Sequence, residues 1–446
     1  MVDVKESAEV HKFGGSCLVR REDLIAIVRR VSDSTSQQVL VVSAFHGVTD
    51  RLLNQLDCGE VANIDAFTAA IELTHLEAAP EIASGPWGAR FKQTLSTLNS
   101  YLRSHSDTPS DSSRAQVLAS GERLSSLAVC SMLADNGIRC HPAWSEEVGI
   151  HIEGSGEEGV IDVDRLRDDL TFDLESSIPV VTGWYGVSES GDITLLGRGG
   201  SDLTATSLAA ALDAREVTIW RDVSGVLSLS PRWSLPSRNL SYLSYTEAVE
   251  LALFSEPMLH PGAVEPLRSL GIPLRLRSLH DDCMDGTRIG PSVLTLSPRV
   301  RAVGSLPRLR PLRIELGAAG SVAPTLAQVS ETLGKARISV WSLRASPGEA
   351  LLLVSERASA HAASLLSALP QPPRYEVLPP VTLLSFVGEG VGEDAEVRES
   401  IRSAADASDL DLVRLESSEH ALRYTVASEQ TEQALERLAR RLDLLT

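Results

Sequence analysis

Several residue types are scarce in this chain of 446 residues, and each shortage argues against a class of protein or site. Aromatic residues make up only 4%, which argues against a platform of stacked rings for nucleic-acid bases. The five cysteines form no CxxC pair and no Cys/His cluster, so we expect neither structural zinc nor a disulfide framework, and a reducing cytoplasm fits. No apolar run approaches the ~18 residues of a membrane helix, and the acidic, polar N-terminus shows no secretory signal.

Positive charge is also in deficit. The chain has 41 Lys and Arg residues against 60 Asp and Glu, which gives a formal net charge of −19 and a pI of about 5.0. This balance argues against nucleic acid as the main partner, because phosphate backbones bind basic surfaces, but a small anion needs only a local positive site. Only four of the basic residues are lysines, so the position of each is informative: Lys5, Lys12, Lys92 and Lys335.

The length and the hydropathy pattern predict several α/β domains. The chain is too long for one core, and its 43% hydrophobic and 23% charged residues are typical of a globular protein. Over the first two thirds, short β-branched runs alternate with segments of helical spacing, which predicts a mostly parallel open sheet with helices on both faces. The expected strands are 8–13, 38–44, 177–183, 216–220 and 272–279, and the expected helices are 21–32, 120–137, 201–214 and 245–255, with an exposed loop at 104–114.

The pattern changes near residues 295–311, a stretch with several prolines and few acidic residues. Two units of similar size follow, each with the order strand, helix, strand, strand, helix, which suggests two ferredoxin-like βαββαβ modules. We therefore expect an N-terminal domain at 1–295, a linker at 296–311, and two modules at 312–379 and 380–446.

Four polar segments lie at the ends of predicted strands or helices, and open parallel sheets bind ligands at the carboxyl ends of their strands. In the first segment, Lys12 stands at the end of the first strand and is followed by Gly14 and Gly15. Paired glycines let backbone N–H groups approach an anion, and the lysine adds a point charge. The alternative is an ordinary strand-to-helix turn with a surface lysine.

The second and third segments carry hydroxyls and a carboxylate. Ser43, Thr49 and Asp50 follow a buried strand, where hydroxyls can hold a carboxylate or an amine, although Thr49 and Asp50 can equally cap the next helix. Glu122 lies in SGERLS at a predicted helix start. It can bind a substrate ammonium or simply complement the helix dipole.

The fourth segment, at 191–202, is the most informative. A glycine pair leads into a helix N-terminus, with Arg198 before it and Ser201 and Asp202 in the first helical turn. Arginine can hold a carboxylate with two hydrogen bonds, and a helix N-terminus attracts negative charge. A free carboxylate at Asp202 can orient a metal ion or a substrate-binding lysine. A glycine loop with a capping residue explains Ser201, but not why Arg198 and Asp202 occur together.

Taken together, these segments resemble the aspartokinase branch of the amino-acid kinase family. The chain matches six motifs of that family in order and spacing: KFGGSC (12–17), VVSAFHGVTD (41–50), ASGERLSS (119–126), ITLLGRGGSD (193–202), WRDVSGVLSLSPR (220–232) and FSEPMLHP (254–261). The resemblance implies the amino-acid-kinase fold at 1–295, with the nucleotide over the carboxyl edge of the sheet and an amino acid beside it. The two C-terminal units resemble the tandem ACT modules of the family.

The resemblance also implies a reaction and its residues. ATP, with Mg²⁺ bridging its phosphates and no confident direct protein ligand to the metal, would phosphorylate the side-chain carboxylate of L-aspartate to give 4-phospho-L-aspartate. Lys12 and Asp202 would act at the phosphoryl-transfer centre. The implied ATP-binding residues are Lys12, Gly14, Gly15, Ser16, Arg221, Asp222 and Arg232, and the implied aspartate-binding residues are Ser43, Thr49, Glu122, Arg198, Gly199, Gly200 and Ser201.

Departures from the family pattern cluster around the nucleotide. Arg221 stands where the family has threonine, Ser230 where it has aspartate, and Pro257 where it has the lysine that usually contacts the ATP phosphates. We hypothesise that Arg221 supplies the charge missing at position 257. In the first C-terminal unit, Trp341 replaces a small acidic residue of the usual amino-acid effector pocket, which leaves effector binding there in question.

Three functions remain open from the sequence. The first is an aspartate kinase, cytoplasmic and homodimeric through its ACT modules. The second is a kinase for another amino acid or carboxylate in a specialised pathway, which the altered nucleotide edge favours. The third is a non-catalytic regulatory paralogue, against which the retention of Lys12 and Asp202 argues.

Overall fold

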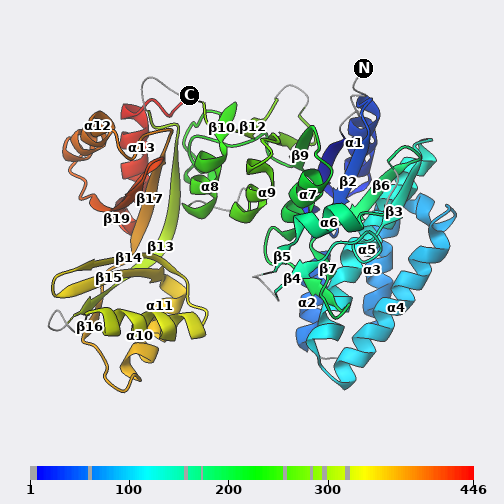
Figure 1. The fold of residues 1–446 in the computed structure, drawn as a ribbon, viewed down its shortest axis with the longest axis horizontal. Coiled ribbons are helices and arrows are strands. Elements are labelled where there is room, and N and C mark those ends of the chain that lie inside the picture. The colour runs from blue at the N-terminus through cyan, green and yellow to red at the C-terminus, as the bar shows by residue number, and fades with distance from the viewer. Residues whose placement is uncertain are drawn as a thin grey trace. The chain divides into compact units, whose positions relative to one another are not determined.

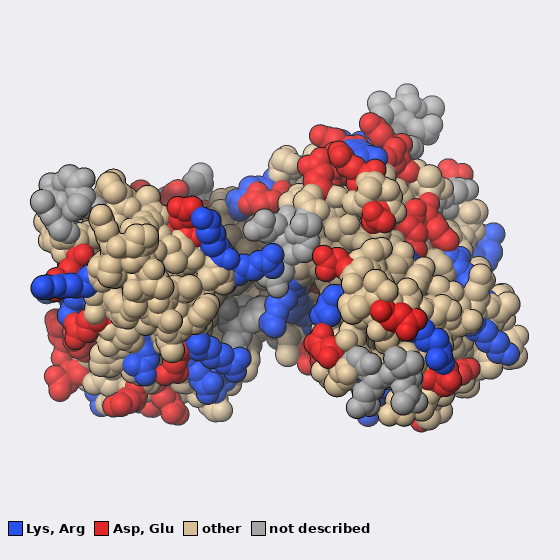
Figure 2. Space-filling view, turned by 90° about the horizontal axis from the view of Figure 1, so that it is seen from below, with Lys and Arg blue, Asp and Glu red and all other residues tan. Residues whose placement is uncertain are grey.

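The computed structural model describes residues 8–58, 63–154, 159–171, 174–254, 259–281, 285–293, 299–316 and 322–446. The chain divides into two compact units. The first comprises residues 1–226, 241–245 and 259–291, and the second comprises 227–240, 246–258 and 292–446. On the face shown in Figure 2, acidic and basic side chains are interspersed over the surface of each unit.

The first unit is built on an eight-stranded sheet with the order β10-β12-β11-β9-β1-β2-β6-β3. The neighbours from β11 to β3 pair in parallel, whereas β12 is antiparallel to β11. This arrangement confirms the predicted, mostly parallel α/β sheet. The strands are β1 (Glu9–Phe13), β2 (Gln38–Val42), β3 (Cys140–Ala143), β6 (Ile178–Thr182), β9 (Glu216–Arg221), β10 (Tyr242–Ser244), β11 (Leu274–Ser278) and β12 (Thr287–Gly290).

Helices cover both faces of this sheet (Figure 1). Successive residues of a strand point to opposite faces, so Phe13 and Val42 face one side and Lys12 the other. Phe13 and Val42 share a core with α5 residues such as Leu124, whereas Lys12 faces α7. The helices of this unit are α1 (Arg21–Asp33), α2 (Val48–Cys58), α3 (Ile64–Ala78), α4 (Gly88–Asp107), α5 (Asp111–Asp135), α6 (Val163–Asp169), α7 (Gly200–Ala211) and α9 (Glu265–Arg268). Two short hairpin sheets complete it, β4 (Ile152–Glu153) with β5 (Val160–Ile161) and β7 (Tyr185–Val187) with β8 (Ile193–Leu195).

Helix α5 corrects two expectations from the sequence. The predicted exposed loop at 104–114 is mostly helical, because α4 runs to Asp107 and α5 begins at Asp111, where Ser110 accepts a hydrogen bond from the N–H of Ser113. The polar residues there mark exposed helix ends rather than a long loop. Glu122 consequently lies in the middle of α5, not at a helix start. Helix α5 is also long and apolar enough to span a membrane by length and composition, but 94% of its apolar window is buried, as in a core helix.

The second unit contains a seven-stranded sheet with the order β14-β15-β13-β17-β19-β18, and β16 also pairs with β13. Its strands are β13 (Ala302–Glu315), β14 (Val340–Ser346), β15 (Glu349–Ser355), β16 (Tyr375–Val377), β17 (Val381–Val387), β18 (Val413–Ser418) and β19 (Ala421–Ala427). Its helices are α10 (Val322–Lys335), α11 (Glu356–Ser367), α12 (Ala395–Asp406) and α13 (Thr431–Arg441), and α8 (Tyr245–Phe254) belongs to it from residue 246 onward.

The long strand β13 serves both ferredoxin-like modules. Its second half pairs with β15 and β16, which gives the first module the predicted βαββαβ order. Its first half pairs with β17 and supplies the second module with a strand that precedes the first module in the chain. The expected linker at 296–311 is therefore wrong for residues 302–311, which form most of β13. A register shift between Leu306 and Leu309 separates the two halves.

Candidate active site

The carboxyl ends of four parallel strands meet at one edge of the first sheet. Phe13 at the end of β1 is in register with Val42 of β2 and with Trp220 of β9, and Val42 is in register with Thr182 of β6. The residues that follow these positions therefore lie side by side at the edge. This register places the first two predicted polar segments side by side, whereas the third lies on helix α5 and the fourth leads from β8 into helix α7.

A cavity of about 310 Å³ lies at this edge. It contains residues from all four segments, which confirms that they converge in space. Eight of the predicted site residues line it: Lys12, Gly15, Ser43, Thr49, Glu122, Gly199, Gly200 and Ser201. The other lining residues are Ala44, Phe45, His46, Gly47, Asp50 and Trp184.

Lys12 and Arg221 both pair with Asp202 beside this cavity. The Nζ atom of Lys12 lies 2.7 Å from Oδ1 of Asp202, and Nη2 of Arg221 donates to Oδ2 at 3.0 Å. Burial alone would raise the pKa of the Asp202 carboxyl, but the charges of Lys12 and Arg221 outweigh it and hold that pKa below its usual value. Asp202 is therefore an anion that fixes two cations, and the cluster carries net positive charge.

Glu122 has the opposite electrostatic character. It is 2% exposed, and its Oε1 accepts a hydrogen bond from the N–H of Ala44 at 3.1 Å. Its Oε2 is buried and has no hydrogen-bond partner among the residues that the structure describes. Burial raises the pKa of this carboxyl to about 8. A ligand that brings an ammonium group to Oε2 would restore its charged form.

The loop that presents α7 depends on glycine. Gly199 has φ +75°, in the left-handed region that favours glycine, and a Cβ there would lie 2.3 Å from Cβ of His260. The hydroxyl of Ser43 donates to Oγ of Ser201 at 3.0 Å, which ties the end of β2 to the start of α7. A side chain on Gly183 would clash with Ser201, because its Cβ would lie 2.7 Å from the Ser201 side chain.

Trp184 is a cavity residue that the sequence analysis missed. Its φ of 72° is unusual for a bulky residue. The conformation is held by hydrogen bonds, since its N–H donates to Oγ1 of Thr204 at 3.2 Å and its carbonyl accepts from the N–H of Leu196 at 2.7 Å. A lone tryptophan after a strand gives no sequence signal for a site. Only the pairing of β6 with β2 places it at the cavity.

The remaining predicted residues fall outside the lining. Gly14 borders the cluster, since a Cβ there would lie 3.3 Å from Nζ of Lys12. Arg198 and Asp222 are exposed side chains and are not among those lining the cavity. Arg232 belongs to the second unit, and Pro257 lies outside the described residues. Ser16 lies in the short 3₁₀ helix after Gly14.

The donor set does not form a metal centre by itself. The described residues contain no group of three or more His, Cys, Asp or Glu side chains placed to hold a metal ion. Asp202, the buried carboxylate at the positive cluster, is already engaged by two cations. A divalent ion in this cavity would need most of its oxygen ligands from phosphates and water.

Comparison with known proteins identifies the fold and its relatives. The family model described as the amino acid kinase family matches residues 8–278. An aspartokinase of Geobacillus stearothermophilus is 36% identical over 187 residues, covering 42% of this chain and 46% of that protein. The chloroplastic aspartokinase 2 of Arabidopsis thaliana is 31% identical over 300 residues, covering 64% of this chain and 55% of that protein. The chain thus spans about half the length of the curated relatives it matches.

Two solved structures share the fold over nearly the whole chain. The structure of E. coli aspartokinase III in complex with aspartate and ADP has a TM-score of 0.82 at 22% identity, covering 98% of this chain and 100% of the other. The Clostridium acetobutylicum aspartate kinase has a TM-score of 0.78 at 19% identity, covering 98% and 99%. At these identities the likeness establishes the fold, including the tandem C-terminal modules.

Proposed function

The chain belongs to the amino acid kinase family, and from this we propose that it is an aspartate kinase that transfers the γ-phosphoryl group of ATP to the side-chain carboxylate of L-aspartate. The observation that carries this proposal is the convergence of a positive cluster and a buried, half-satisfied carboxylate on one cavity. The curated relatives are named aspartokinases, and one structure of the same fold was solved with aspartate and ADP.

The cavity suits an amino acid with two carboxylates. Oε2 of Glu122 would accept the substrate ammonium, and the hydroxyls of Ser43, Thr49 and Ser201 would hydrogen-bond its oxygens. Arg198, exposed just before the glycine pair, would hold a carboxylate with two parallel hydrogen bonds when the substrate is bound. The backbone of Gly199 and Gly200 would leave room for the substrate beside α7.

The reaction needs positioning and charge neutralisation rather than a protein nucleophile. A side-chain carboxylate oxygen of aspartate forms a bond to the γ-phosphorus while the bond from that phosphorus to the β–γ bridging oxygen breaks, giving 4-phospho-L-aspartate and ADP with no proton transferred. Lys12 and Arg221 would neutralise the charge that builds on the phosphoryl oxygens. Asp202 holds both cations in place before the substrates bind.

The nucleotide would lie on the glycine turn after β1. Backbone N–H groups around Gly14, Gly15 and Ser16 would donate to its phosphates, and Asp222 would contact it further out. Because Pro257 replaces the usual family lysine, Arg221 is proposed as the substituting cation, which its contact with Asp202 supports. Mg²⁺, when bound together with ATP, would neutralise the charge of the phosphates.

One assay tests this proposal against the two alternatives. The full chain is incubated with Mg-ATP, hydroxylamine and a panel of amino acids, and acyl hydroxamates are measured. Aspartyl hydroxamate is the expected product. A hydroxamate of a different acid would assign another acceptor, and ATP binding without any hydroxamate would favour a non-catalytic paralogue.

We also propose a cytoplasmic homodimer. The described cysteines Cys17, Cys58, Cys130 and Cys140 are free, which fits a reducing compartment. Strand β14 exposes the apolar side chains of Val340 and Leu343, which supports an apolar contact between modules across a dimer. Trp341 packs on the Leu309, Leu353 and Leu383 cluster, which favours assembly over effector binding at that position. Light scattering of the full chain would measure the oligomeric state.

A further inference from the structure

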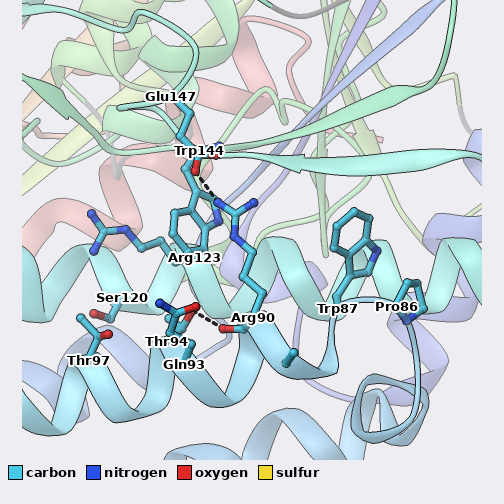
Figure 3. A pocket seen from close by; sticks show the side chains of 11 residues that line it. Pro86, Trp87, Arg90, Gln93, Thr94, Thr97, Ser120, Arg123, Trp144 and Glu147 are labelled. Carbon is cyan, nitrogen blue, oxygen red and sulfur yellow. Dashed lines mark hydrogen bonds and ion pairs between the residues drawn. The ribbon is translucent and has the colours of Figure 1, made fainter.

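A second cavity, of about 560 Å³, lies in the first unit away from the sheet edge. It is walled by the first turns of α4, the middle of α5 and the turn after β3 (Figure 3). Helix α5 separates it from the candidate active site, because Ser120 and Arg123 line the second cavity whereas Glu122, between them in the sequence, lines the first. Its volume is within the range of small-molecule binding sites.

One wall of this cavity combines an indole ring with two guanidinium groups. Figure 3 shows Trp144 between the side chains of Arg90 and Arg123. Cζ of Arg90 lies 3.6 Å from the centre of the Trp144 ring, and Cζ of Arg123 lies 5.4 Å from it. Cation–π attraction orients both cations against the ring. The wall therefore presents an aromatic ring together with two guanidinium groups.

Each of these arginines is balanced by a glutamate. Nη2 of Arg90 lies 2.5 Å from Oε1 of Glu147, and Nη2 of Arg123 donates to Oε1 of Glu146 at 2.6 Å. The side chains of Arg90 and Glu147 are 29% and 46% exposed. A pair this open to water exchanges its partners easily, because solvent screens the attraction. The cavity thus offers one cation and one anion that a ligand can contact separately.

The polar groups of the cavity leave both donors and acceptors for a ligand. Arg123 is 7% exposed, and its Nε has no acceptor within the part of the chain that the structure describes. The hydroxyls of Ser120 and Thr94 donate to the carbonyls of Gln116 and Arg90, at 2.9 and 2.8 Å, so their oxygens keep lone pairs that can accept hydrogen bonds. A fitting ligand would carry acceptor oxygens for the guanidinium side and N–H donors for the hydroxyl side.

We propose that this cavity is a second ligand site, which binds a small zwitterion of the α-amino-acid class. The ligand carboxylate contacts the guanidinium of Arg90 and its ammonium contacts Glu147, so that the ligand takes the place of the exposed ion pair between them. Further polar groups of the ligand can reach Arg123 and the hydroxyls of Ser120 and Thr94. A ligand with only a carboxylate would leave Glu147 without a partner, and a ligand with only an ammonium would leave the arginine without one. The ring of Trp87, at the opposite end in Figure 3, provides an apolar surface for the ligand side chain.

The test uses the full chain and the twenty protein amino acids as probes at millimolar concentration, first by thermal shift and then by calorimetry. For each amino acid that binds, the matching amine and the matching carboxylic acid, each lacking one charged group, are measured in parallel. We expect the intact amino acid to bind and both half-ligands to bind about tenfold more weakly or worse. The proposal is overturned if no amino acid binds or if one half-ligand binds as well as the intact compound.

Variants separate this cavity from other sites on the chain. Thr97→Trp fills the cavity, and Ser96→Trp places the same ring on the exposed neighbouring position of α4 as a matched control. We expect Thr97→Trp to abolish the binding and Ser96→Trp to retain it. If Thr97→Trp fails to fold, Arg90→Gln and Glu147→Gln replace it, and each is expected to raise the dissociation constant about tenfold. Binding that is unchanged in these variants would place the amino acid elsewhere and overturn the proposal.

Discussion

The Nζ atom of Lys12, on strand β1, lies 2.7 Å from Oδ1 of Asp202, on helix α7. Both side chains are nearly buried, with exposed fractions of 10% and 4%. A buried ion pair of this kind is costly to form unless further partners satisfy it, and Arg221 supplies one at Oδ2. The three residues therefore act as one unit, and a change in any of them is felt by the others.

Replacing Lys12 should nearly abolish phosphoryl transfer. In Lys12→Met the transition-state charge loses one of its two proposed cations, and a loss of about 3 kcal/mol, or a factor of about 100 in kcat, is expected. The hydroxamate assay measures the rate. Lys92→Met, at an exposed lysine of α4, is the matched control and should retain full activity. Full activity in Lys12→Met would exclude the proposed phosphate contact.

Replacing Arg221 should lower the rate of phosphoryl transfer as much as replacing a phosphate-binding lysine does. Arg221→Ala is expected to lower kcat by about 100-fold, because it removes a cation from the proposed nucleotide site and leaves Asp202 with Lys12 alone. Arg221→Lys should recover part of this loss, which a purely structural role would not explain. The control is Arg215→Ala, at an exposed arginine just before β9. An unchanged ATP turnover in Arg221→Ala would reject the hypothesis that Arg221 supplies the positive charge missing at Pro257.

Aspartate binding should release a proton from Glu122. In the free protein the pKa of Glu122 is raised to about 8, so near pH 7 the carboxyl is mostly protonated, and an ammonium ligand must displace that proton. The dissociation constant for aspartate should therefore fall as pH rises toward 8, by at most about tenfold per pH unit. Calorimetry in two buffers of different ionisation enthalpy measures the proton directly. Glu122→Gln should show no release, whereas Glu153→Gln, at an exposed position, should behave as the parent.

The carboxyl of Glu122 should also make the free energy of unfolding depend on pH. Because the pKa of Glu122 is raised in the folded protein, the folded state keeps a proton that the unfolded chain releases above its ordinary value of 4.5. The contribution of Glu122 to stability is therefore greatest at low pH and is lost as pH rises through about 8. Chemical denaturation of the parent and of Glu122→Gln from pH 5 to 8 should show a smaller decline in the variant. If the stability of the parent and of Glu122→Gln declines equally between pH 5 and 8, the raised pKa of Glu122 is contradicted.

A buried pair should anchor α8 to the second module. Glu250 of α8 forms an ion pair and hydrogen bond with Arg423 of β19, and both side chains are about nine-tenths buried. Glu250→Gln or Arg423→Met should destabilise the protein by about 3–5 kcal/mol, because each leaves the other group buried without its charge partner. The double variant Glu250→Gln/Arg423→Met should lose less stability than the sum of the losses in the two single variants. Arg402→Met, which breaks an exposed pair with Glu399, should leave the stability almost unchanged, because solvent screens that pair.

Some residues of the cavity could be predicted from the sequence and others could not. Gly15, the Gly199–Gly200 pair, Lys12 and Ser43 were predicted because strand ends and glycine turns have local signatures, and the structure brings them to one cavity. Trp184 was not predicted, since its left-handed backbone and its place at the edge come from contacts with Thr204 and Leu196. Arg198 was predicted beside Asp202, but its side chain is exposed and Arg221 takes that position instead.

The sequence by itself determined the alternation of strands and helices, the two C-terminal modules, and the residue types that line the candidate site. These follow from hydrophobic periodicity and turn residues, which act over a few positions. Only the tertiary structure decided that residues 302–309 complete the second C-terminal module and that Arg221 rather than Arg198 meets Asp202. It also decided that Oε2 of Glu122 is buried without a hydrogen-bond partner among the residues that the structure describes. Strand pairing and desolvation depend on which distant segments come together, and no local pattern encodes that choice.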